Sequence, residues 1–77
     1  MRRRDRREYD VSLNEGCGTA SVWVVDGYGR PISYDKRDRR YWCSVVGVHT
    51  REQAIAAAKE RGLRLDGTNT VPSLLPK

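Results

Sequence analysis

Apolar and polar residues alternate where the chain leaves its charged N-terminal run. Tyr9, Val11 and Leu13 are separated by Asp10 and Ser12, and this two-residue period is typical of a half-buried strand. Residues 14–18 interrupt the pattern with two glycines. Residues 19–25 resume it with β-branched side chains, so they predict a second strand.

Two turns divide the segment that follows. Residues 26–29 contain an aspartate and two glycines, which favour a tight reversal. The chain is then expected to return over residues 31–34 as a short edge segment, because Pro31 cannot donate to a central ladder. Residues 35–40 form a polar turn. Residues 41–48 are the most apolar run of the chain and predict the central strand of the sheet.

Residues 51–61 carry the signals of a helix. Thr50 and Gln53 have the spacing of a capping box, in which each side chain satisfies a backbone N–H of the first turn. Four alanines supply high helix propensity. Gly62 is placed to end the helix in the left-handed conformation, and Leu63 to pack back onto Ala58 in a Schellman motif.

These elements predict an α+β fold, in which a small three-stranded antiparallel sheet packs against one C-terminal helix in the order β-β-β-α. We expect a flexible basic arm over residues 1–8, a single domain over residues 9–67, and an extended or disordered tail over residues 68–77. A chain of 77 residues buries only about 60% of its unfolded surface. It leaves little room for a deep catalytic cleft, and we do not expect an enzyme.

Positive charge is concentrated in two segments. Of the net charge of +5, residues 1–7 carry +4 (five arginines, one aspartate) and residues 35–40 carry +2 (four basic, two acidic), which leaves −1 for the remainder. Such clusters suit a polyanion, because arginine and lysine release counterions from phosphates. A disordered solvating terminus is the alternative interpretation of the arginine run. The predicted nucleic-acid contacts are Arg2, Arg3, Arg4, Arg6, Arg7, Lys36, Arg37, Arg39 and Arg40.

Trp23 and Trp42 are the bulkiest side chains of the predicted sheet. Alternation places Trp42 and Cys43 on opposite faces of their strand. The single helix covers one face, so the other face is expected to carry an aromatic side chain. Three uses are open for it: stacking on bases, a protein interface, or an extension of a small core.

The remaining reactive residues do not form a recognisable site. Cys17 and Cys43 are expected to be reduced thiols, with a disulfide as the alternative. His49 precedes the helix cap, where a turn residue is expected rather than a general base. No catalytic residue, metal ligand or cofactor is predicted. No apolar run is long enough for a signal sequence or a bilayer span, and we expect a cytoplasmic protein.

An arginine-rich start, strands that carry the pair Tyr41 and Trp42, and a single following helix resemble the arm-binding domain at the N-terminus of lambda-type phage integrases. They also resemble plant AP2-type DNA-binding domains. The resemblance is architectural and covers residues 1–62. It implies that an exposed sheet face lies in the DNA major groove, that the basic arm adds contacts, and that Arg37, Arg39 and Arg40 lie near the sheet edge.

We therefore expect a small, non-enzymatic nucleic-acid-binding protein of phage or mobile-element type, with DNA favoured over RNA. If a phage encodes the chain, its location is the host cytoplasm. The alternative is a protein-interaction factor, such as a phage-encoded inhibitor or host-directed effector, whose aromatic sheet face binds an acidic partner. We expect no membrane contact, and a monomer or a weak homodimer formed through an edge strand.

Overall fold

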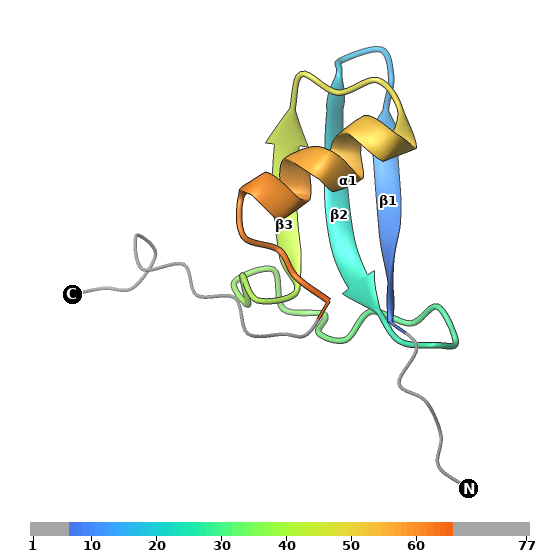
Figure 1. Ribbon diagram of the computed structural model, residues 1–77, viewed down its shortest axis with the longest axis vertical. Coiled ribbons are helices and arrows are strands. Elements are labelled where there is room, and N and C mark those ends of the chain that lie inside the picture. Colours follow the sequence, from blue (N-terminus) through green and yellow to red (C-terminus); the bar gives the residue numbers. More distant parts are fainter. Residues whose placement is uncertain (1–6, 66–77) are drawn as a thin grey trace, which may run out of the picture.

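The computed structural model describes residues 7–65, which form an open three-stranded antiparallel sheet with one helix across it (Figure 1). The strands lie in the order β1-β2-β3, with β2 in the centre. The predicted α+β class and the β-β-β-α order are confirmed. The elements are β1 (Glu8–Asn14), β2 (Thr19–Val25), β3 (Trp42–Val46) and α1 (Arg51–Glu60).

The sheet has one apolar face, and α1 covers it. Alternation along each strand places every second side chain on this face. α1 contributes Ala54 and Ala58, which are fully buried, and these small side chains allow the helix to lie close to the strands. The strand residues of this face are Tyr9, Val11, Leu13, Ala20, Val22, Val24, Cys43 and Val45.

Local hydrogen bonds begin α1 largely as the sequence predicts. Thr50 is the N-cap, and its Oγ1 accepts the backbone N–H of Gln53 at 3.1 Å. Gln53 Oε1 in turn accepts the N–H of His49 at 2.7 Å, one residue before the cap rather than at the cap itself. The reciprocal bonds of a capping box are therefore present, shifted by one residue on one side.

The C-terminal end of α1 has the predicted Schellman motif. Gly62 adopts a φ of 97°, and its N–H donates to the Lys59 carbonyl at 3.0 Å. The N–H of Leu63 donates to the Ala58 carbonyl, also at 3.0 Å. These bonds bring the Leu63 side chain into the core, where it is 1% exposed.

The prediction that residues 41–48 form the central strand is wrong. β2 pairs with both of its neighbours, so β3 is an edge strand. It also ends at Val46, since Gly47 adopts a φ of 79° that turns the chain out of the sheet. The predicted edge segment, residues 31–34, makes only a bridge between Pro31 and Val25 and one bond from the Ile32 N–H to β2.

Parts of the predicted domain division lie outside the described residues. These are residues 1–6 of the arm, residues 66–67 of the domain and the tail, residues 68–77. Glu8, the last residue of the predicted arm, belongs to β1.

Candidate nucleic-acid interface

Residues 26–41, called the basic loop below, connect β2 to β3 at one end of the sheet (Figure 1). Its first turn is fixed by Asp26, whose Oδ1 accepts the backbone N–H groups of Tyr28 at 2.8 Å and Arg30 at 2.9 Å. The bond from Arg30 is the main reason that the pKa of the Asp26 carboxyl lies below its ordinary value. The loop thus has its own hydrogen-bonded frame without regular secondary structure.

Two further aspartates order the second half of the loop and pair with two of its arginines. Asp35 Oδ1 accepts the Arg37 backbone N–H at 2.9 Å and its Nε at 3.2 Å. Asp38 Oδ1 accepts the Arg40 Nε at 2.9 Å and its backbone N–H at 3.3 Å. The Arg37 backbone N–H lowers the pKa of Asp35, and the Arg40 guanidinium lowers that of Asp38. Both carboxylates are therefore ionised at neutral pH and offset the charge of these arginines.

Among the basic residues of the segment 35–40, Lys36 and Arg39 have no carboxylate partner in the part of the chain that the structure describes. Both lie over the indole of Trp42, with the Arg39 guanidinium carbon 4.5 Å and the Lys36 Nζ 5.9 Å from the ring centroid. A cation over an aromatic face keeps its full charge and its outward N–H donors. Within the segment 35–40, these are therefore the two cations whose charge no ion pair offsets.

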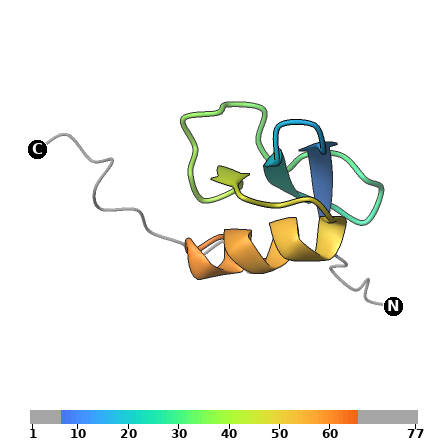
Figure 2. The same cartoon turned by 90° about the horizontal axis from the view of Figure 1, so that it is seen from above.

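Trp23 and Trp42 lie in register on the open face of the sheet, with ring centroids 5.7 Å apart and an interplanar angle of 56°. Both side chains are half-buried. The basic loop lies on this side of the sheet, opposite α1 (Figure 2). Among residues 7–65, the buried Nε1 of Trp42 has no hydrogen-bond partner. Because Lys36 and Arg39 lie over it, the ring of Trp42 does not present a bare face to solvent.

The basic loop presents two tyrosines to solvent that were not predicted as site residues from the sequence. Tyr28 is 84% exposed and Tyr34 is 75% exposed. Tyr28 lies between Gly27 and Gly29, which have no side chains to cover it, and this spacing was the available signal. Exposed aromatic rings beside cations are typical of surfaces that stack on nucleic-acid bases.

Of the five arginines in the predicted arm, only Arg7 lies within the described residues 7–65. Its Nη1 donates to the carbonyl oxygen of Leu65 at 2.8 Å, so this side chain is bound to the folded domain. Arg7 precedes β1, at the end of the sheet where the basic loop leaves β2. Arg2, Arg3, Arg4 and Arg6 lie outside the described residues.

Polar side chains form the middle of the open face. Ser12, Ser21 and Ser44 form a row across the three strands. In the neighbouring row, Asp10 of β1 lies opposite Trp23, which places a carboxylate on this face at the β1 side. The charge of the open face therefore changes from acidic at β1 to basic near the loop.

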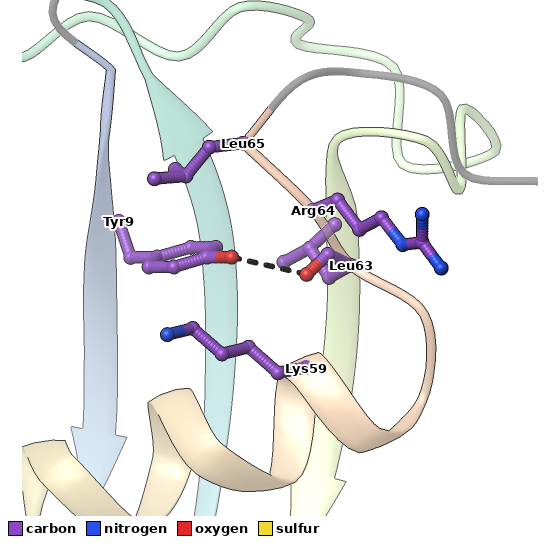
Figure 3. A pocket seen from close by; sticks show the side chains of 5 residues that line it. All are labelled: Tyr9, Lys59, Leu63, Arg64 and Leu65. Carbon is purple, nitrogen blue, oxygen red and sulfur yellow. Dashed lines mark hydrogen bonds between the residues drawn. The ribbon is translucent and has the colours of Figure 1, made fainter.

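An open hollow of about 430 Å³ lies on the helix side of the sheet (Figure 3). The Tyr9 hydroxyl donates to the Leu63 carbonyl at 3.0 Å, and the Lys59 Nζ lies 5.8 Å from the Tyr9 ring centroid. Tyr9, Lys59, Leu63, Arg64 and Leu65 line the hollow. None of these five residues is a histidine, a cysteine, a serine or a carboxylate.

The two cysteines are both free thiols, as expected; Cys17 is exposed and Cys43 is half-buried. The His49 ring packs beside Gly18, where an added Cβ would lie 3.0 Å from its Cε1. Residues 7–65 contain no group of three or more histidine, cysteine, aspartate or glutamate side chains that could hold a metal ion. Within the same residues, no helix has the length and apolar character to cross a membrane.

No protein-family model, curated protein or solved structure matches the chain.

Proposed function

We propose that this chain is a small, non-enzymatic nucleic-acid-binding protein that contacts its ligand through the basic loop, with DNA as the first candidate. One observation carries the proposal: the same ordered loop holds the exposed Tyr28 and Tyr34 and the cations Lys36 and Arg39, which have no carboxylate partner within residues 7–65. The cations can bind phosphates, and the tyrosine rings can stack on bases.

The charge distribution favours a path for the ligand along the basic loop and β3. Asp10 and Glu8 lie on the open face of β1, where they would repel phosphates. The arginines of the predicted arm join the described chain through Arg7, at the end of the sheet where the loop lies. The hydroxyl row of Ser12, Ser21 and Ser44 adds groups that can donate to phosphate oxygens or base edges.

The resemblance to integrase arm-binding domains would place the open sheet face in the major groove. In this chain the basic loop stands on that face (Figure 2), so we propose that the loop, rather than the strands alone, makes the first contacts. The alternative function, an aromatic face that binds an acidic protein, needs accessible indoles. Trp23 and Trp42 are half-buried, and this favours the basic loop as the interface.

The test is binding to labelled duplex DNA, single-stranded DNA and RNA, followed by fluorescence anisotropy across a salt series. The loop variant is Lys36→Ala with Arg39→Ala. The matched control, Lys59→Ala with Arg64→Ala, also removes two exposed cations but from the helix side of the sheet. Each lost phosphate contact lowers the salt slope on duplex DNA by about 0.9. We expect the loop variant to lose about 1.8 and the control to keep its slope.

A second variant, Tyr28→Ala with Tyr34→Ala, separates stacking from charge. It keeps every cation, so we expect an unchanged salt slope and weaker binding to single strands, by about 1–3 kcal/mol for each base that loses its stacking partner. If the loop variant and its helix-side control lose the same amount of salt slope, the interface is not at the basic loop. Absence of binding to all three nucleic acids at low salt would refute the proposed function.

A further inference from the structure

The two outer edges of the sheet differ in what covers them. On β1, the Nη2 of Arg51 donates to the Tyr9 carbonyl at 2.9 Å, so a side chain occupies part of that edge. On β3, no strand pairs with the outer side, because β2 is the only neighbour of β3 in the sheet that residues 7–65 form. An uncovered edge presents unpaired N–H and C=O groups that can pair with another extended chain.

The register identifies the outward groups of β3. The N–H of Val24 donates to the Tyr41 carbonyl at 3.0 Å, which places Tyr41 among the residues that bond to β2. The N–H and C=O groups of successive residues point to opposite edges of a strand. The backbone groups of Cys43 and Val45 therefore also point towards β2. Trp42, Ser44 and Val46 direct their N–H and C=O groups away from the sheet. β3 therefore offers a row of alternating donors and acceptors.

Two walls border this edge. The C-terminal end of α1 extends past β3 on one side of the sheet, and the basic loop stands on the other side (Figures 1 and 2). Arg61 caps that end of α1, and Arg39 belongs to the loop. Burial raises the pKa of the Cys43 thiol, and the positive charges of Arg61 and Arg39 oppose this increase. The charges of both guanidiniums therefore reach Cys43 of β3.

We propose that the β3 edge binds an extended acidic peptide segment, which adds to the sheet as a fourth strand. The backbone of the peptide pairs with the outward groups of Trp42, Ser44 and Val46, and its carboxylates meet Arg39 and Arg61. Val46, which is 64% exposed, offers an apolar neighbour for one peptide side chain. This edge adjoins the proposed nucleic-acid path along the basic loop and β3 and shares Arg39 with it.

A second copy of this chain fits the β3 edge less well than a single extended segment. The C-terminal end of α1 extends past β3 (Figures 1 and 2), so a pairing of two β3 strands about a two-fold axis would have to accommodate the overhanging ends of both helices. It would also join two chains that each carry a net charge of +5. A peptide strand has no helix to accommodate.

The test is amide hydrogen exchange, measured by NMR on the full chain in the presence of a capped peptide of alternating glutamate and valine about as long as β3. We expect the outward amides of Trp42, Ser44 and Val46 to exchange about tenfold more slowly with the peptide at saturation. The inward amides of Cys43 and Val45 already bond to β2 and should change little. A peptide with lysine in place of glutamate should have no effect.

Charge reversal tests the acidic chemistry. Arg61→Glu should weaken binding of the glutamate peptide and permit binding of the lysine peptide. Lys59→Glu makes the same charge change in the last turn of α1, where the side chain lies over the Tyr9 ring, and should leave both peptides unaffected. Ser44→Pro removes an outward N–H without touching the bonds to β2, so it should abolish binding. If Ser44→Pro does not fold by circular dichroism, the Arg61→Glu result decides.

Three results would overturn the inference. The first is unchanged exchange at the outward β3 amides with the glutamate peptide present. The second is slower exchange at the Val11 and Leu13 amides of β1 instead. The third is protection of the β3 edge that grows with protein concentration in the absence of peptide, which would assign the edge to a second copy. None of these measurements involves nucleic acid, so they are independent of the proposed function.

Discussion

Trp42 has two structural roles that two substitutions can separate. Its ring supports Arg39 and packs against Trp23, while its buried Nε1 has no hydrogen-bond partner among residues 7–65. Trp42→Ala removes both the ring and the N–H. Trp42→Phe keeps an aromatic ring and removes only the polar atom. We expect the first variant to be destabilised and the second to be as stable as the original chain, or slightly more so.

The magnitudes follow from the contacts. Half-burial of a tryptophan removes about 100 Å² of surface from water, which contributes about 2.5 kcal/mol. The aromatic pair adds about 1 kcal/mol, and the cation over the ring about 0.5–1 kcal/mol. Burial of the unpaired N–H costs about 1–2 kcal/mol, which both variants recover. Trp42→Ala should therefore lose about 2–3 kcal/mol, and Trp42→Phe should gain between 0 and about 1 kcal/mol.

The assay is urea unfolding followed by circular dichroism, with a thermal scan as a check. For a chain of this size, 2–3 kcal/mol corresponds to a decrease of about 10–20 °C in Tm. If Trp42→Phe proves as destabilised as Trp42→Ala, the Nε1 has a hydrogen-bond partner and the reasoning is wrong. If neither variant changes stability, Trp42 does not support the basic loop, and the indole is available as an interface residue.

Three further predictions concern other parts of the fold. Gly62→Ala places a Cβ at a φ of 97°, where no atom lies within 4 Å of it. Backbone strain alone should therefore lower the free energy of unfolding by about 1 kcal/mol in the same urea assay. An unchanged free energy of unfolding would contradict the left-handed cap. Arg51→Ala exposes the β1 edge, and the glutamate-valine peptide should then also slow exchange at the β1 amides, an effect that the unsubstituted chain should lack. The carboxyls of Asp26, Asp35 and Asp38 have pKa values below their ordinary 3.8, so they stabilise the folded loop above that pH. As the pH falls below about 3.8 and through the lower folded values, tryptophan fluorescence should report the loop leaving the indoles, and a signal that changes only near neutral pH would contradict this assignment.

The helix and its two ends could be predicted because they depend on local chemistry. The Thr50 cap binds the N–H of Gln53, three residues later. The N–H groups of Gly62 and Leu63 bond to carbonyls three and five residues earlier. The first two strands were also predictable, because the period-two pattern records which side chains face a core. Each strand was found within about one residue of its expected position, a shift that strand fraying accounts for.

The order of the strands was not contained in those local signals. Residues 41–48 are the most apolar run, yet β3 lies at the edge, because two successive reversals place β2 between its neighbours. Apolar content reports burial of side chains and not the number of strands that pair with the backbone. The helix supplies the burial for Val45, even though only one strand edge of β3 is paired.

The candidate interface also needed the tertiary structure. The sequence placed Lys36 and Arg39 in one cationic group with Arg37 and Arg40, because charge counts do not reveal which arginine meets an aspartate. It placed an aromatic side chain such as Trp23 or Trp42 on the exposed sheet face, whereas both are half-buried, and Lys36 and Arg39 of the basic loop lie over Trp42. Which groups pair, and which remain open to a ligand, depends on contacts between segments far apart in the chain; only the folded structure brings those segments together.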